Sequence, residues 1–187
     1  MQERKILIVD DEPDVLNTLQ DILTEAGYKV ETASDGQEAL RKMEAFPAEV
    51  ILSDYMMSGM DGIELLKKIK QSYPHVVPII LTGRGDLQVS FKAINQGEIF
   101  RFLLKPWDTE ELYMTIHTAL QYYDLILENK RLAKTVKKQQ SLLEEIEKKY
   151  PGITIVNEEE DGTIPIEDED YSEVLNCLQV EEKDYSK

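Results

Sequence analysis

The sequence predicts a parallel, doubly wound α/β domain that continues into a long helix and ends in an acidic segment. Two observations support this. Five short runs rich in apolar and β-branched residues alternate with helical patterns, and three of the runs are nearly continuous in apolar residues. Continuous apolar runs are typical of parallel strands covered on both faces. A length of 187 residues suits one domain plus an extension.

The predicted strands are residues 5–9, 28–33, 49–53, 76–81 and 100–104. The helical patterns between them are residues 14–26, 36–46, 62–73 and 86–96, and each stops at or next to a glycine or proline. A fifth helix begins at Asp108, a good N-cap, and has no stop signal before Pro151. Repeated strand–helix units favour right-handed crossovers in one sheet.

The second half of the fifth helix carries a heptad pattern. Its core positions are Tyr122, Leu125, Asn129, Leu132, Val136, Gln139, Leu143, Ile146 and Tyr150. A narrow apolar seam with charged neighbours predicts a coiled coil, and Asn129 at a core position favours a parallel, in-register homodimer. The alternative is an extension that folds back on its own domain. The predicted segments are therefore 1–121 (globular domain), 122–150 (coiled coil) and 151–187 (acidic tail).

The tail has a composition of its own. Two short apolar runs flank Asp161-Gly162, a hairpin signal, and residues 171–179 could form a short helix. From residue 158 to 187 there are twelve acidic residues and two lysines. Such a charge excess indicates a segment that is disordered or only locally folded.

The overall composition limits the possible functions. The net charge of −16 argues against a surface for nucleic acid or for an anionic membrane. No apolar run approaches the roughly 20 residues of a membrane span, and the chain starts directly with a strand rather than a secretory signal. One cysteine fits a reducing cytoplasm. Two histidines are too few for most zinc sites.

Polar side chains cluster where the predicted strands end. They are Asp10, Asp11 and Glu12 after the first strand, Asp54 after the third, Thr82 after the fourth and Lys105 after the fifth. In open α/β sheets, sites form at the carboxyl ends of the strands. If the strand order is 2-1-3-4-5, these carboxylates converge, with Thr82 and Lys105 beside them.

Three crowded carboxylates need a counter-charge, and oxygen ligands suit Mg²⁺. Lys105 and Thr82 are suitable donors to phosphoryl oxygens. Together these parts predict phosphoryl transfer onto an aspartate. Each residue alone has an ordinary explanation, as a helix cap, a turn residue or a solvated strand end. Their joint occurrence at successive strand ends favours the site.

Four motifs in order, ILIVDDE, ILSDYMMSGMDG, IILTG and FRFLLKPW, make residues 5–120 resemble the receiver domain of two-component response regulators. The resemblance implies a flavodoxin-like strand order of 2-1-3-4-5. It implies that Asp54 accepts a phosphoryl group from the phosphohistidine of a sensor histidine kinase or a phosphotransfer protein. It also implies Mg²⁺ ligands at Asp10 (mostly through water), Asp11, Asp54 and the backbone carbonyl of Met56.

The same resemblance assigns the remaining residues. Thr82 and Lys105 would hold the phosphoryl group, Lys105-Pro106 would be a cis peptide, and Thr82 and Phe102 would form the conformational switch. Two positions depart from the family pattern: Ser58 replaces a usual proline and Gly83 a usual alanine. Neither is an expected phosphoryl or metal contact.

The output is less defined than the receiver. No basic helix-turn-helix pattern follows, and the basic stretch 129–138 falls within the heptads. The KPW motif also occurs in receivers attached to HD-type cyclic-dinucleotide phosphodiesterases, which need more histidines than this chain has. We therefore expect signalling through protein–protein contacts, without nucleic-acid or membrane binding. The alternative is the front of a longer regulator whose output domain, either a phosphodiesterase or a DNA-binding module, is missing.

An aspartate-nucleophile phosphatase is the competing enzymatic interpretation. Such enzymes place the nucleophile in a DxD motif after the first strand, whereas this strand ends in DDE and the isolated Asp54 follows the third. We therefore expect no enzyme beyond slow self-phosphorylation from small phosphodonors and slow autodephosphorylation.

Overall fold

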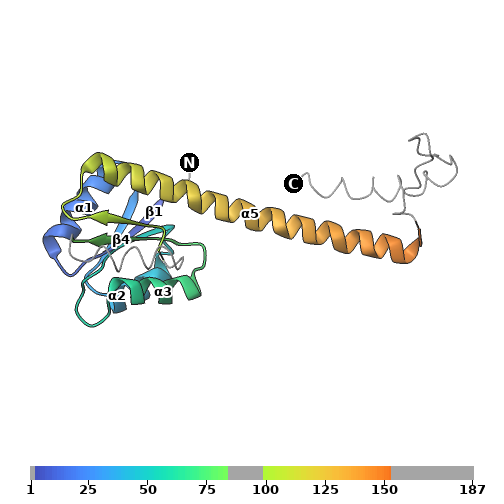
Figure 1. Ribbon diagram of the computed structural model, residues 1–187, viewed down its shortest axis with the longest axis horizontal. Coiled ribbons are helices and arrows are strands. Elements are labelled where there is room, and N and C mark those ends of the chain that lie inside the picture. The colour runs from blue at the N-terminus through green and yellow to red at the C-terminus, as the bar shows by residue number, and fades with distance from the viewer. Residues whose placement is uncertain (1–2, 84–98, 153–187) are drawn as a thin grey trace. The chain divides into compact units, whose positions relative to one another are not determined.

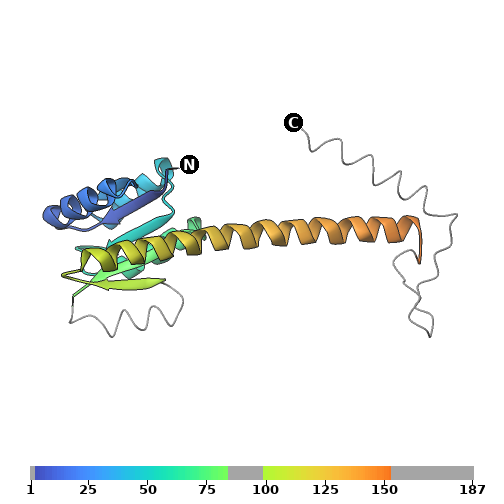
Figure 2. The same cartoon turned by 90° about the horizontal axis from the view of Figure 1, so that it is seen from above.

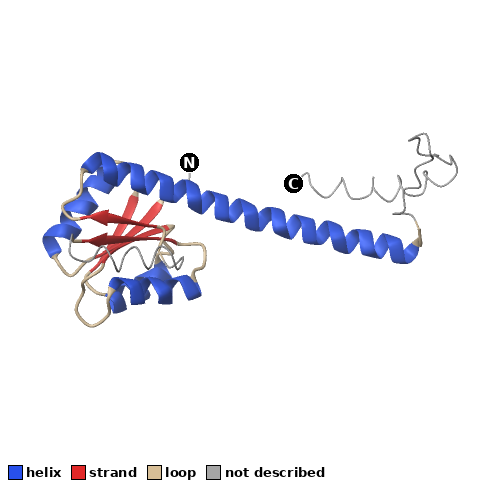
Figure 3. Cartoon of the chain, viewed as in Figure 1, coloured by secondary structure: helices blue, strands red, loops and turns tan. Residues whose placement is uncertain are grey.

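The computed structural model describes residues 3–83 and 99–152, which form an alternating α/β domain and a long helix (Figure 3). The elements are β1 (Lys5–Val9), α1 (Pro13–Glu25), β2 (Lys29–Ala33), α2 (Gly36–Ala45), β3 (Val50–Asp54), α3 (Gly62–Ser72), β4 (Val77–Thr82), β5 (Arg101–Leu104) and α5 (Thr109–Lys149). The predicted helix at 86–96, the predicted hairpin and the short helix of the tail lie outside the described residues.

The five strands form one parallel sheet in the order β2-β1-β3-β4-β5, as the resemblance to receiver domains implies. Figure 2 shows the domain from above, with helix α5 in front of the strands. The strand bounds differ from the predicted ones by one residue at most ends, so that Asp54 and Thr82 are the last residues of β3 and β4. β3 and β4 are buried along their whole length, which explains their continuous apolar runs.

Helices cover both faces of the sheet (Figure 1). Buried residues of α2 and α3, such as Met43 and Leu66, pack with Leu7 and Ile51 on one face. Buried residues of α1 and α5, such as Leu23 and Ile116, form a second cluster with alternate strand residues. Successive strand residues point to opposite faces, so each strand contributes to both clusters.

Short polar signals set the helix starts. Asp35 accepts a hydrogen bond from the Glu38 amide at 2.8 Å, and Asp61 accepts one from the Glu64 amide at 2.8 Å. These are N-caps of α2 and α3. Helix α1 instead begins with Pro13, which suits the first helical position.

Helix α5 starts on the domain and runs on as one helix to Lys149. Its fully buried residues are Leu112, Thr115, Ile116 and Ala119, followed by Leu120 at 5% exposure. The chain divides into two units, Met1–Ala133 and Lys134–Lys187. Among the residues that the structure describes, no helix is long and apolar enough to cross a membrane.

Candidate functional site

Residues distant in the sequence meet at the carboxyl edge of the sheet. Asp10 directly follows β1, Asp54 ends β3, Thr82 ends β4 and Lys105 directly follows β5. All strands are parallel, so these positions share one edge. The structure brings three of the predicted side chains into direct contact: Asp10, Asp54 and Lys105.

The Lys105 ammonium lies between the two carboxylates. Its Nζ is 2.7 Å from Asp10 Oδ2 and 2.5 Å from Asp54 Oδ1, and Glu12 Oε1 is 3.6 Å away. Asp10 is completely buried and Asp54 is 7% exposed. Buried charges require partners, and here one cation serves two acids. A strand can therefore end on a lysine because that lysine points into an acidic cluster.

Burial and pairing act in opposite directions on these groups. Burial raises the pKa of Asp54, and the hydrogen bond and charge of Lys105 only partly offset that rise. For Lys105, burial alone would lower the pKa, but the carboxylates of Asp10 and Asp54 outweigh it and the pKa is raised. The ammonium form of Lys105 is thus stabilised next to a carboxylate that is costly to leave unpaired.

Backbone contacts hold the three side chains in place. The Met56 amide donates to Asp54 Oδ2 at 2.7 Å, and the Glu12 amide donates to Asp10 Oδ1 at 2.9 Å. The Lys105 amide donates to the Thr82 carbonyl at 2.8 Å, and the Lys105-Pro106 peptide is cis, as expected. Each acid therefore uses one oxygen for the backbone and the other for Lys105.

The side chains of three other predicted site residues have different contacts. Asp11 is exposed, and its Oδ2 accepts a long hydrogen bond of 3.4 Å from the Ser58 amide. The Thr82 hydroxyl, 1% exposed, donates to the Gly83 carbonyl at 3.3 Å. Phe102 is partly buried against the core cluster on the α2/α3 face.

The acid cluster contains side chains of the types that bind a metal ion, but they are not gathered into a metal site. Within residues 3–83 and 99–152, no three acidic, histidine or cysteine side chains are gathered closely enough to hold a metal ion. The carboxylates of Asp10, Asp11 and Asp54 are nevertheless hard oxygen donors of the kind that Mg²⁺ takes. The ammonium of Lys105 lies between two of them.

Gly62 is a site residue that sequence analysis missed. A Cβ atom at this position would lie 2.1 Å from the backbone oxygen of Asp54. The Gly62 amide also donates to the Tyr55 carbonyl at 3.0 Å, which closes the loop after Asp54. The only sequence signal was the Asp61-Gly62 pair at a helix start, which is equally consistent with a simple cap.

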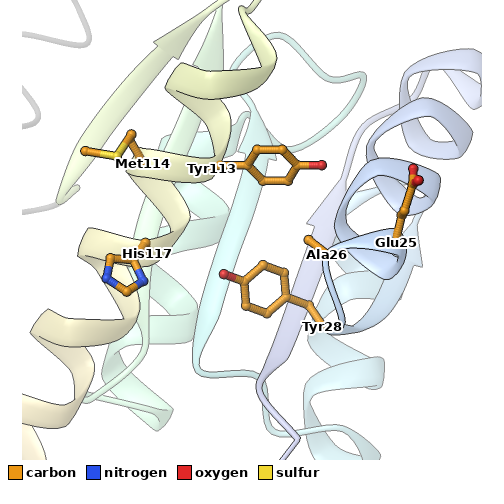
Figure 4. Close-up of a pocket in the computed structure, with 6 residues that line it drawn as sticks. All are labelled: Glu25, Ala26, Tyr28, Tyr113, Met114 and His117. Atoms are coloured by element: carbon orange, nitrogen blue, oxygen red, sulfur yellow. The ribbon is translucent and has the colours of Figure 1, made fainter.

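An open pocket lies between the end of α1 and helix α5 (Figure 4). It is lined by Glu25, Ala26, Tyr28, Tyr113, Met114 and His117. Tyr28 immediately precedes β2, so this pocket is at the amino edge of the sheet, opposite the acid cluster. It therefore contributes nothing to the chemistry of Asp54.

Comparison with known proteins identifies the class that this fold and site define. The family model described as the response regulator receiver domain matches residues 6–117. The transcriptional regulatory protein GlrR of Escherichia coli is 40% identical over 116 residues, which cover 62% of this chain and 26% of GlrR. The DNA-binding transcriptional regulator NtrC of Escherichia coli is 37% identical over 123 residues, 66% of this chain and 26% of NtrC.

A solved structure gives the same result. The signal receiver domain of an HD domain-containing protein from Pseudomonas fluorescens is 37% identical, with a TM-score of 0.64, and the match covers 68% of this chain and 94% of that one. The chain therefore belongs to the response regulator receiver domain family. It is a receiver of a two-component response regulator, and it spans about a quarter of the length of the curated relatives it matches.

Proposed function

We propose that Asp54 is the phosphoacceptor of this receiver and takes its phosphoryl group from the phosphohistidine of a sensor histidine kinase or a phosphotransfer protein. The observation that carries the proposal is the buried Asp54 carboxylate, paired with Lys105 and adjacent to Asp10. Two acids share one lysine, so the cluster retains negative charge and can accept further positive charge.

In the transfer, an Asp54 carboxylate oxygen attacks phosphorus as the phosphorus–nitrogen bond breaks. The histidine nitrogen keeps the electron pair and takes up a proton, and Asp54 becomes an acyl phosphate. Lys105 then passes from the carboxylate to a phosphoryl oxygen. The Thr82 hydroxyl, which now donates to the Gly83 carbonyl, turns to another phosphoryl oxygen.

Mg²⁺ belongs to the same proposal. Asp10, Asp11, Asp54 and the Met56 carbonyl would hold it, with Asp10 acting mostly through water. When bound, the ion supplies positive charge that stabilises the phosphoryl oxygens during transfer.

Phosphoryl incorporation from acetyl phosphate, measured by intact mass, tests the proposal. Wild type should gain one phosphoryl group when Mg²⁺ is present and should gain none when Mg²⁺ is chelated. Asp54→Asn should gain none. Asp14→Asn, which changes an exposed acid on α1, is the matched control and should behave as wild type. Incorporation into Asp54→Asn at the wild-type rate would refute the assignment.

The proposed role is that of a signalling protein with slow self-phosphorylation and slow autodephosphorylation. An aspartate-nucleophile phosphatase would instead turn over aryl phosphates many times. Sustained turnover that depends on Asp54 would favour that alternative over the receiver role.

We further propose that phosphorylation is read out through parallel pairing of the segment 122–150 in two chains. Two apolar seam residues support it: Leu125 is 55% exposed and Leu132 48%. In this proposal Thr82 moves toward the phosphoryl group and Phe102 fills the space it leaves, which changes the surface that leads into α5. Sedimentation with and without beryllofluoride measures the coupling, and identical association in both states would contradict it.

The alternative output is a further domain of a longer regulator. NtrC is named as a DNA-binding regulator and the Pseudomonas receiver comes from an HD domain-containing protein. The matched regions cover only part of this chain and about a quarter of NtrC, so such an output is a second candidate, while our proposal for this chain is protein–protein contact without nucleic acid.

A further inference from the structure

Arg4 joins two carboxylates at the amino edge of the sheet, opposite the phosphorylation site. Its Nη1 donates to Glu49 Oε2 at 2.9 Å and to Asp124 Oδ1 at 2.9 Å, and its Nη2 pairs with the other oxygen of Asp124. Arg4 precedes β1, Glu49 precedes β3, and Asp124 lies on α5. One side chain therefore ties two central strands to the helix.

The chemistry of this cluster favours a fixed geometry. Glu49 is 8% exposed; burial raises its pKa, and the nearby Arg4 opposes the rise. Arg4 contacts both oxygens of Asp124, and a planar guanidinium fork restricts the orientation of a carboxylate more than a lysine does. A second polar contact, of 2.7 Å between Lys130 Nζ and His75 Nε2, lies farther along the same helix.

These contacts bear on the direction in which α5 leaves the core. Tyr123 and Ile126 pack against the core, whereas Leu125 is exposed. Tyr122 is 44% exposed and stacks on Phe100, with the ring centroids 4.9 Å apart. Consecutive helix residues differ by about 100° in direction, so the packed face and the exposed face of this turn adjoin each other. The earlier turns of α5 are fixed by its buried core residues. The bidentate ion pair at Asp124 acts on the turn beyond them, where the apolar contacts of Tyr123 and Ile126 are only partial.

We propose that Arg4 is a positioning residue for the dimer surface. By holding Asp124 beside Glu49, it sets the direction in which α5 leaves the core, so that Leu125, Asn129 and Leu132 face a second copy of this chain. The identity of the partner rests on the proposed pairing of segment 122–150. The clamp, meaning the contacts of Arg4 with Asp124 and Glu49, is a property of one chain and is tested in a monomer.

Thiol labelling of the full chain provides that test. The background carries Cys177→Ser, to remove the native thiol, and Leu132→Asp with Leu143→Asp, to prevent pairing. Ile126→Cys reports the release of the α5 face that packs on the core. Leu125→Cys reports the accessibility of the exposed face. Arg4→Gln should speed labelling at position 126 by roughly tenfold, as expected for loss of a charge-assisted contact, and leave the rate at position 125 unchanged.

Three comparisons separate a clamp from general destabilisation. Ala39→Cys, at a fully buried position on α2, should stay protected in the Arg4→Gln chain. Asp124→Asn should reproduce the effect of Arg4→Gln, and the double change should add little, because the two residues act through one contact. Arg131→Gln is the control, since Arg131 pairs with Glu128 within the helix, with Arg131 Nη2 2.6 Å from Glu128 Oε1.

The outcomes are distinct. An unchanged rate at position 126 in Arg4→Gln, additive effects of the two changes, or equal acceleration at position 39 would each overturn the clamp. If Arg4→Gln does not fold, Arg4→Lys, which keeps one charge but not the fork, is measured in its place. With the seam intact, Arg4→Gln should also weaken association. A wild-type chain that never associates would refute the pairing and leave the monomer result valid.

Discussion

Lys105 and Gly62 illustrate, at the scale of single residues, two ways in which this site is held. Lys105 acts by charge, because its ammonium is shared by Asp10 and Asp54. Gly62 acts by having no side chain, which lets α3 approach the backbone of Asp54. The Lys105 contacts join the ends of three strands, and the Gly62 contact joins the start of α3 to the end of β3. The position of Asp54 therefore depends on packing as well as on its own strand.

Gly62→Ala should destabilise the domain and displace Asp54. The new Cβ would lie 2.1 Å from the Asp54 oxygen and 3.1 Å from Ile80 Cδ1, so the backbone must shift. We expect a loss of about 2–3 kcal/mol in the free energy of unfolding, as for overpacked cores, measured by urea denaturation.

Gly59→Ala is the comparison for that experiment. Its φ is +84° and a Cβ would meet nothing within 4 Å, so only backbone strain of about 1 kcal/mol is expected. Phosphoryl incorporation should fall in Gly62→Ala and persist in Gly59→Ala. Equal stability losses in the two variants would contradict the close-approach explanation.

At the scale of elements, α2 is stabilised by its first turn. Glu38 Oε2 accepts from the Ser34 amide at 2.7 Å and from the Ser34 hydroxyl at 2.8 Å, while the Glu38 amide donates to Asp35. The pKa of Glu38 is lowered to about 2, chiefly by the Ser34 amide and then by Lys42. This reciprocal arrangement resembles a capping box displaced by one residue.

The sign of the pH dependence follows from that lowered pKa. A carboxyl group with a depressed folded-state pKa stabilises the fold above its unfolded pKa, and this contribution is lost as the pH falls toward about 2. Glu38→Gln should cost about 1 kcal/mol at pH 7, allowing for partial solvent screening, and almost nothing at the acid limit.

The measurement is the free energy of unfolding of Glu38→Gln and of wild type, from neutral pH down to a pH of about 2. Glu44→Gln, at an exposed position near the end of the same helix, is the control and should show no such pH-dependent difference. A Glu38→Gln penalty that is constant with pH would contradict the assignment to the ionised carboxylate.

At the scale of the whole molecule, the proposed function depends on the exposed apolar residues of α5. Leu132 occupies a core heptad position and is 48% exposed, whereas Leu127 is 39% exposed but lies off the seam. Leu132→Asp should raise the dimer dissociation constant by roughly 100-fold or more, since two apolar side chains per dimer lose their burial.

Leu127→Asp makes the same chemical change on an outward heptad position and should leave association unchanged. Sedimentation equilibrium of both variants provides the comparison. Equal weakening by the two substitutions would indicate non-specific apolar association rather than a heptad seam.

Much of the architecture could be predicted because its signals are local. Strands β3 and β4 are recognisable from continuous apolar runs. The strand order follows from the resemblance to receiver domains, and given that order the strand ends predict that Asp10, Asp54 and Lys105 meet. The cis peptide before Pro106 followed from the resemblance. The domain bounds and the roles of the site residues stay predictions.

The sequence by itself thus determined the α/β alternation, the family and the edge of the sheet where the chemistry belongs, because hydrophobic period and strand-end residues are short-range properties. Only the tertiary structure decided that the Thr82 hydroxyl donates to Gly83, that Gly62 must approach Asp54, and that Arg4 meets Asp124. Arg4 and Asp124 are separated by 120 positions, and no local pattern encodes a contact whose geometry depends on how a helix is rotated against a folded sheet.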